Sequence, residues 1–501
     1  MLSRILGLVR DILFFATFGT SLFGEAFLLA FTLPNLFRRM LGEGTLSSAF
    51  IPVFANLQNS NHCNTQWKLL NQVLTRLLSF LVILSLLVGL VCWITYEFNI
   101  LQNPKWHEAI FLNGITFIYV IFICASAILV GALNVKNSFW AGAFSPVVLN
   151  AFMICALFFS GVVYSLNFSK CALALSISVV FAGIFQLFLP WFELRKKFNW
   201  KWNLNFSQSS QLNEVKTLFW VGAFGAAIAQ INILVSRLLA YLLEEQGPVS
   251  YLYMSARLVE LPLGVFAIAL STILFPQLSR AISLGDEKKY NETFLKGLRI
   301  IIMFTVPSAV GLYVLGDLII RTLFEWREFR FKDAALSSEV LSLVAWTIPL
   351  YALSTFLIKS FHSQKNMRVP LRAAVLSLLV NLMGSFFLMG SFGVMGLAWA
   401  NLLAAFFQLA YLALRNSNIS LSSAFFVKEI CFPNVLLASF VMFLALNYCR
   451  NITQFGQSKT DIILQLIVTI GLGMFTYFSV LLITKFPFSQ EKPLLFRANR
   501  K

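Results

Sequence analysis

The chain has 501 residues, of which 58% are hydrophobic and 12% charged, and its mean hydropathy is +0.79. A soluble domain carries about twice that share of charged residues, so the composition excludes a soluble globular protein. Apolar runs long enough to cross a bilayer as helices recur along the whole chain, whereas the short alternating strands of an outer-membrane barrel do not. Because backbone hydrogen bonds in lipid must be satisfied within helices, we expect an all-α, polytopic membrane protein.

Fourteen membrane-spanning helices are predicted, and the second and eighth are long and interrupted by Pro34 and Pro262. We expect three parts: an N-terminal lobe of six spans over 1–200, a C-terminal lobe of six spans over 201–420, and two further spans with a basic tail over 421–501. In chain order the predicted spans cover residues 1–20, 23–55, 72–96, 108–133, 140–163, 171–194, 213–243, 248–279, 294–315, 336–361, 370–390, 393–414, 425–449 and 462–484.

An internal repeat supports the division into two lobes. Pro34 and Pro52 in the first half are echoed by Pro262 and Pro276 in the second, in similar apolar sequences and roughly 225–230 residues further on. Six spans per copy is an even number, so the two copies share one orientation as parallel repeats. This plan is typical of transporters that alternate access between two lobes.

The formal net charge is +17, and its distribution predicts the topology. With the loops numbered by parity, 23 basic residues lie on the even side and 8 on the odd side. The positive-inside rule then places the even side, and with it both termini, in the cytoplasm. The excess charge is therefore explained by topology and by attraction to anionic membrane lipids, and nucleic acid is not an expected partner.

Seven basic residues fall inside the predicted spans, and all seven are arginines. An arginine facing lipid at mid-membrane costs about 2.5–3.5 kcal/mol, so the seven together would cost on the order of 20 kcal/mol. They must therefore reach the interface or line a hydrated cavity. Arg76 is predicted to snorkel from the start of its span, and Arg237 either lines the interior or forms a structural pair. The other five are Arg4, Arg10, Arg38, Arg39 and Arg257.

Carboxylates accompany these five arginines in the same spans. Arg4 and Asp11 are seven residues apart and Arg257 and Glu260 three apart, so each of these pairs lies on nearly one helix face. One interpretation is a set of buried ion pairs that hold the bundle together. The other is a cationic cavity for an anionic ligand, because the planar guanidinium suits phosphate. The accompanying carboxylates are Asp11, Glu25, Glu43 and Glu260.

The two helix-breaking prolines lie about a turn from these arginines. Discontinuous helices near the midplane build the substrate sites of many transporters, so Pro34 and Pro262 are predicted hinges. No catalytic residue, metal site or cofactor is expected, because the seven cysteines are scattered and the three histidines lie at predicted helix ends or loops. The longest predicted outer loop, 316–335, is expected to form an amphipathic interfacial stretch that includes Phe324 and Phe329.

Several sequence blocks resemble those of one known family. In the first half these blocks are SRILGLVRD over 3–11, EAFLLAF over 25–31 and LPNLFRR over 33–39. In the second half they are ARLVELPLGV over 256–265 and TILFP over 272–276. Together they resemble the MurJ/MviN family of lipid II flippases, within the MOP exporter superfamily, and the resemblance covers nearly the whole chain.

The resemblance implies a fourteen-helix transporter, not an enzyme, with a central cationic cavity in the bacterial cytoplasmic (inner) membrane. Its substrate would be lipid II, the undecaprenyl-pyrophosphate-linked peptidoglycan precursor, moved from the cytoplasmic to the outer leaflet. The last two helices resemble those that form a groove for the polyprenyl tail, and the cell-wall synthesis machinery is an implied partner. Arg10, Arg38 and Arg257 match cavity residues essential for transport, and Arg4, Asp11 and Glu25 match further cavity or gate positions.

Some positions depart from the family pattern. Glu25 stands where aspartate is usual, which keeps the charge. Ser236 and Ser385 stand where sodium-binding relatives carry aspartate, although Asn381 matches another ligand; we therefore predict no bound sodium and expect the membrane potential to drive transport. The alternatives are a flippase for another polyprenyl-linked glycan, which the charge argument leaves open, and a membrane glycosyltransferase, which would need a catalytic carboxylate on a sizeable outer loop.

Overall fold

The computed structural model describes residues 2–42, 45–59, 63–416, 431–452, 458–484 and 486, and every regular element in these ranges is a helix. The expected all-α class is confirmed. The chain divides into two compact units, unit 1 (Met1–Ser250 with Phe324–Asp333) and unit 2 (Tyr251–Leu323 with Ala334–Lys501). These units are defined by which helices pack together, whereas the three predicted parts are defined by the sequence repeat, so their boundaries differ. The helix over 210–242 packs in unit 1, and the last two helices pack in unit 2.

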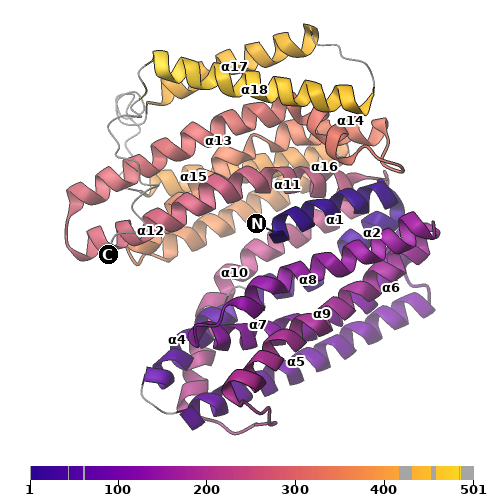
Figure 1. Ribbon diagram of the computed structural model, residues 1–501, viewed down its shortest axis with the longest axis vertical. Helices are drawn as coiled ribbons and strands as arrows, with labels where there is room; N and C mark the ends of the chain where they lie inside the picture. Colours follow the sequence, from indigo (N-terminus) through magenta and orange to yellow (C-terminus); the bar gives the residue numbers. More distant parts are fainter. Residues whose placement is uncertain are drawn as a thin grey trace. The chain divides into compact units, whose positions relative to one another are not determined.

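Unit 1 contains the first ten α-helices and two π-helical segments. Helices α7, α8 and α9 pack against one another, and α1 lies along α8 (Figure 1). In chain order the elements are α1 (Leu2–Phe18), α2 (Leu22–Ala30), α3 (Thr32–Phe37), η1 (Arg38–Gly42), α4 (Thr45–Asn59), α5 (Cys63–Glu97), α6 (Pro104–Thr116), α7 (Tyr119–Val135), α8 (Trp140–Leu157), η2 (Phe158–Val163), α9 (Phe168–Phe198) and α10 (Ser210–Leu242).

The predicted interruption of the second span is present and has a clear cause. Pro34 has no backbone N–H, so the carbonyl of Ala30, four residues earlier, receives no helical hydrogen bond from it. The side chains of Asn113 and Thr116 in α6 donate to this carbonyl instead, at 2.9 and 3.3 Å. A freed backbone group inside a membrane protein needs such a partner. The chain continues as the short α3 and then as the π-helix η1, which carries two of the predicted site arginines.

The core of unit 1 lies between α4, α5, α7 and α10. Phe50 and Phe54 are fully buried in it, and Trp200, in the segment between α9 and α10, is 2% exposed. The Trp200 indole N–H donates to Asn71 at 3.0 Å, which fixes this connecting segment to the first turns of α5. The outer face of α5 is instead exposed and apolar, as expected of a helix that faces lipid.

Unit 2 holds the remaining helices, except for the first three residues of α11 and of α14 and the last residue of α13, which belong to unit 1. A third π-helix, η3, follows Pro262 directly, so this predicted interruption is also present. Gly393 (φ +54°) divides α16 into two helical halves. The halves pack closely at Gly384 and Ala400, because a Cβ added to Gly384 would lie only 3.3 Å from the Cα of Ala400. The elements are α11 (Pro248–Pro262), η3 (Leu263–Ile268), α12 (Ala269–Ser283), α13 (Glu287–Phe324), α14 (Phe331–Val344), α15 (Thr347–Ser363), α16 (Arg368–Leu414), α17 (Phe432–Ile452) and α18 (Lys459–Ile483).

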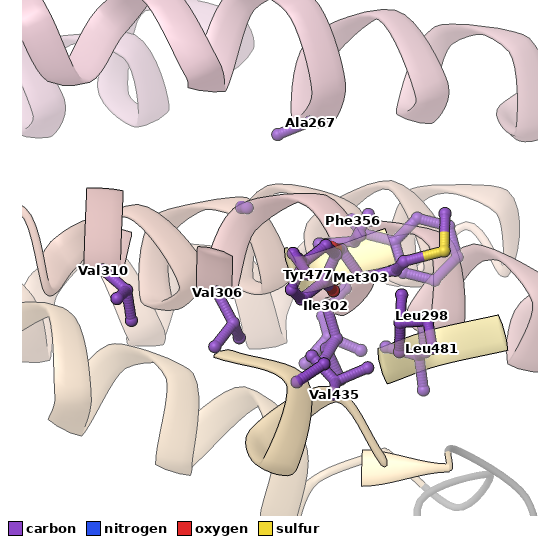
Figure 2. Close-up of a cluster of buried hydrophobic side chains, with 14 of the residues drawn as sticks. Ala267, Leu298, Ile302, Met303, Val306, Val310, Phe356, Val435, Tyr477 and Leu481 are labelled. Carbon is purple, nitrogen blue, oxygen red and sulfur yellow. Dashed lines mark hydrogen bonds between the residues drawn. The ribbon is translucent and has the colours of Figure 1, made fainter. Parts of the chain in front are cut away.

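One continuous cluster of buried side chains joins α12, α13, α15, α17 and α18 in unit 2. Figure 2 shows its centre, where Ile302 and Met303 of α13 lie beside Phe356 of α15 and Tyr477 of α18. The Tyr477 hydroxyl donates to the carbonyl of Met303 at 2.6 Å, so this buried polar group is satisfied. Helices α17 and α18 run side by side (Figure 1). Their buried side chains, with the Tyr477 hydrogen bond, attach both helices to the cluster of unit 2.

Nine helices within the described ranges are long and apolar enough to cross a membrane. A tenth is added if α14 and α15, bent by 43° at their junction, form one span. Helix α16 counts once here, although its two halves match the separately predicted spans 370–390 and 393–414. A polytopic membrane fold is therefore confirmed, and the number fourteen stays a prediction.

Candidate functional site

Arg10 lies in α1, and two side chains fix the direction of its guanidinium. Nη2 and Nε donate to Oδ1 of Asp11 at 2.6 and 3.0 Å, and Nη1 donates to Oδ1 of Asn150 in α8 at 3.1 Å. Asn150 in turn donates to the carbonyl of Ser3. The Arg10 side chain is 12% exposed and the Asp11 side chain 3%, so the pair is largely shielded from solvent. One guanidinium is thus held in place by an acid and an amide.

Asp11 and Arg4 were predicted to lie on nearly one helix face, but the ion pair that Asp11 forms is with Arg10. Arg4 is exposed in the first turns of α1, and no ion pair to it occurs in the part of the chain that the structure describes. Seven residues on one helix leave two full turns between these side chains. The adjacent Arg10, turned toward α8, reaches the carboxylate instead. Asp11 is therefore an ion-pair residue, as predicted, but with a different partner.

Arg38 and Arg39 lie on η1, and both side chains are half-buried. The Nε of Arg38 donates to Oδ1 of Asn35 at 3.0 Å. A π-helix inserts an extra residue into a helical turn, and such segments are frequent at functional sites. Here the π-helix follows the break at Pro34, so two adjacent arginines are placed where the helix is irregular. Glu43, the predicted gate residue that follows them, lies outside the described residues.

Glu25 lies in the first turn of α2, and its side chain is fully buried. Oε1 accepts from the backbone N–H groups of Val249 and Ser250 at 2.7 and 3.4 Å, and Oε2 lies 3.4 Å from Nζ of Lys105. Glu25 thus caps the first turn of α11 from outside that helix. The predicted ion-pair role holds, but the partner is a lysine from a neighbouring helix.

Lys105 is the residue that sequence reasoning missed, because it was counted among the loop charges. The structure buries it to 6% exposure in the first turn of α6. Its ammonium donates to the carbonyls of Leu243 and Glu245 and lies 4.6 Å from the ring centroid of Tyr241. The Tyr241 hydroxyl donates to the Lys105 carbonyl. This cluster joins α2, α6 and the segment between α10 and α11. The one sequence signal for it is that Lys105 directly follows Asn103-Pro104, a pair that typically starts a helix.

Two further arginines inside the predicted spans, Arg76 and Arg237, also belong to unit 1 and contact protein groups. Arg237 donates to the hydroxyl of Thr32 in the interrupted span at 2.6 Å. Of its two predicted roles, lining the interior or forming a structural pair, this contact agrees with the second. Helix α5 begins at Cys63, so Arg76 does not lie within a turn of its helix start as predicted, and the snorkelling of its side chain stays a prediction. Its guanidinium donates to backbone carbonyls between α9 and α10, including that of Phe206 at 2.7 Å.

The predicted outer loop 316–335 is expected to place its aromatic side chains at the membrane interface. Trp326 and Phe331 are indeed exposed, at 44% and 59%, but for Phe324 and Phe329 the expectation is wrong. Phe324 and Phe329 are 0% and 1% exposed, and both rings pack edge-on against Phe15 of α1 at 5.6 Å. Asp333 accepts from the Thr20 hydroxyl at 2.7 Å. Alternating apolar residues predict an amphipathic segment equally well whether lipid or another helix covers them, so the sequence could not decide between the two.

Unit 2 contributes Arg257 and Glu260, one turn apart in α11. Nη1 of Arg257 lies 3.1 Å from Oε2 of Glu260, and the side chains are 34% and 48% exposed. The pair predicted from the spacing therefore forms, but an exposed pair contributes little to stability, about 0–1 kcal/mol. Pro262 follows within the last turn of α11, directly before η3. In α16 the Ser385 hydroxyl donates to the buried Asn381 at 3.5 Å.

The site residues are suited to holding an anion. Within the described ranges, no three side chains from His, Cys, Asp and Glu come together in a way that could hold a metal ion. Each arginine of the first two spans offers a planar set of N–H donors that matches phosphate oxygens. Asp11 pairs with Arg10, Glu260 with Arg257, and Glu25 with Lys105.

Comparisons with known proteins agree with this description. A family model described as "Lipid II flippase MurJ" matches residues 14–465. A "Probable lipid II flippase MurJ" from Haemophilus influenzae is 31% identical over 479 residues, which is 89% of this chain and 90% of that protein. A solved structure titled "Lipid II flippase MurJ, inward closed conformation" superposes with a TM-score of 0.78 at 26% identity, covering 96% of each chain. A multidrug-resistance MATE transporter of the MOP superfamily, in an inward-facing conformation, shares the fold at 14% identity (TM-score 0.65, 82% of this chain and 94% of that one).

Proposed function

The chain belongs to the lipid II flippase MurJ family, and from this premise we propose how its residues carry lipid II across the membrane. It is a lipid II flippase of the MOP superfamily, a bacterial membrane transporter and not an enzyme. The family assignment also disfavours the two alternatives, a flippase for another glycan and a membrane glycosyltransferase. The roles of individual residues, the orientation and the driving force are the content of the proposal.

Arg10, Arg38 and Arg257 bind the pyrophosphate of lipid II, with Arg4 and Arg39 adding to the positive field. The observation that carries this proposal is the placement of Glu25. Because Glu25 pairs with Lys105, its charge does not neutralise the arginines. By residue count, the four arginines of the first two spans are then accompanied by two acids, Asp11 and Glu43, so the first two spans, apart from Glu25, carry two more positive than negative charges. An anionic group compensates such an excess.

Arg10 is preorganised by its two partners. Its contacts with Asp11 and Asn150 fix the guanidinium before the substrate arrives, so less side-chain entropy is lost on binding. Arg38 lies on a π-helix after a proline break, where a small backbone change re-aims the side chain. We assign to Arg10 a fixed contact and to Arg38 a mobile one. Pro34 and Pro262 serve as the hinges of the two interrupted spans.

The driving force is the membrane potential, and no bound sodium takes part. In this proposal both termini lie in the cytoplasm, and the anionic head group of lipid II moves from the cytoplasmic to the outer side. A negative-inside potential favours this movement by about 2.3 kcal/mol per charge per 100 mV. The substitutions at 236 and 385, where the resemblance expects carboxylates, leave a cation site without its charges. Imposing potentials of either sign on proteoliposomes checks this, because the translocation rate must follow the potential and must not need sodium.

Single variants test the residue roles. Arg10→Ala, Arg38→Ala and Arg257→Ala are each expressed in a host depleted of the native protein, and lipid II on the outer leaflet is measured with an impermeant probe. We expect each variant to lose export while remaining inserted, and Arg195→Ala, an exposed arginine in the last turn of α9, to retain it. Full export by all three variants at normal protein levels would refute the assignment.

A further inference from the structure

Unit 1 contains a cavity that the transport site does not use. It has a volume of about 450 Å³, within the usual range for small-molecule pockets. Three elements form its walls: η1 with the start of α4, the middle of α5, and the first turns of α10. Its lining is apolar apart from two basic residues, and includes Phe37, Leu41, Val73, Leu77, Phe219 and Trp220.

The cavity lies in an exposed, apolar wall of unit 1. Phe80 and Trp220, which both line it, are 56% and 61% exposed, and α5 presents an exposed apolar face along most of its length. An apolar cavity of this kind offers water too few hydrogen-bond partners. A hydrocarbon chain from the surrounding bilayer meets no such penalty, so the walls select a lipid chain over a polar molecule.

The two basic residues of the lining are Arg76 and Lys216. Arg76 donates from Nη2 to the carbonyls of Phe206 and Ser207 at 2.7 and 2.8 Å, and no carboxylate lies within ion-pair distance among the residues described. Lys216 is exposed in α10, and Glu214 nearby makes no ion pair in the same part of the chain. Two positive charges thus flank an apolar cavity, and among the residues that the structure describes neither forms an ion pair with an acid.

We infer that this cavity binds one acyl chain of an anionic phospholipid, with the lipid phosphate between Arg76 and Lys216. The chain fills the apolar space, and the basic pair recognises the head group through charge and, at Arg76, through its planar N–H donors. The same cavity is walled by Phe37 and Leu41, which flank Arg38 and Arg39 on η1. A bound chain therefore supports the π-helix that carries two site arginines, and the lipid acts as a structural cofactor of the transporter.

Fluorescence quenching tests the inference, because Trp220 lines the cavity. The full-length protein is titrated in mixed micelles with phosphatidylglycerol or phosphatidylcholine, each brominated in its acyl chain, and the quenching lost in Trp220→Phe is taken as the Trp220 signal. We expect saturable quenching with phosphatidylglycerol at a lower mole fraction than with phosphatidylcholine. Lys216→Gln should raise the half-saturating fraction about fivefold, the effect of one basic residue at an anionic surface.

Lys68→Gln is the matched control, because Lys68 is an exposed lysine near the start of α5 that does not line the cavity. It should leave the titration unchanged. Arg76→Gln is read only alongside Lys216→Gln, since Arg76 also holds the segment before α10. Equal quenching by the two lipids, or no saturable Trp220 signal, would overturn the inference. So would loss of the phosphatidylglycerol quenching when an unbrominated polyprenyl phosphate is added at a much lower mole fraction than the phosphatidylglycerol, since the substrate's chain would then be the preferred occupant.

Discussion

The buried ion pair between Glu25 and Lys105 makes the sharpest prediction about stability. Glu25→Ala removes the charge partner of a lysine that is 8% exposed, and also the acceptor of the Val249 and Ser250 N–H groups. Breaking a buried pair on one side costs about 3–5 kcal/mol, because the remaining charge stays buried without compensation. Lys105→Ala should cost a similar amount for the same reason.

Glu25→Gln separates the two contributions. The amide oxygen still accepts from Val249, so only the charge is lost, and we expect a cost of about 1–3 kcal/mol. The double variant Glu25→Ala with Lys105→Ala should cost less than the sum of the single ones, because neither charge is then left alone. Equilibrium unfolding by SDS in mixed micelles measures these free energies.

A half-exposed pair provides the control for this series. Lys197 pairs with Glu193 at 2.6 Å; the glutamate is 6% exposed, but the lysine is 57% exposed. Ser138 also donates to the same carboxylate oxygen, so Lys197→Ala should cost no more than about 1 kcal/mol. Strict additivity of the Glu25 and Lys105 variants, with costs like that of Lys197→Ala, would show that the buried pair does not hold the unit together.

Three further variants test other parts of the structure. Asn113→Ala removes the amide that donates to the Ala30 carbonyl at the proline break, and should cost about 1–3 kcal/mol in the same unfolding assay. Gly19→Ala forces a Cβ to within 2.6 Å of the Glu328 carbonyl oxygen at φ +55°, and should lower the thermal unfolding midpoint of the purified protein. Arg257→Ala should change the unfolding free energy by no more than about 1 kcal/mol, because its ion pair is exposed, yet abolish lipid II export; a large loss of stability would instead make Arg257 structural.

The sequence predicted well whatever depends on a single helix. Pro34 and Pro262 mark real interruptions because a missing N–H acts within one turn of its own helix. Arg257 and Glu260 pair for the same reason, since their spacing alone brings them together. The all-α membrane class follows from composition, which does not depend on how the helices pack.

Contacts between helices were not predictable in this way. Spacing placed Asp11 on the face of Arg4, but the direction of the Arg10 side chain toward α8 decided the pairing. Lys105 reads as a loop charge until α2 and the segment before α11 are placed around it. Phe329 likewise reads as interfacial until α1 covers it. In each case the deciding partner lies far away in the sequence.

The central claim is that this chain exports lipid II, and depletion of the protein in its host tests it most directly. An impermeant probe added from outside reports lipid II on the outer leaflet, and extraction of the cells reports the total. The account predicts that lipid II accumulates inside while the outer pool falls, and that the wild-type chain restores export. An unchanged lipid II distribution, with another polyprenyl-linked glycan accumulating inside, would contradict it.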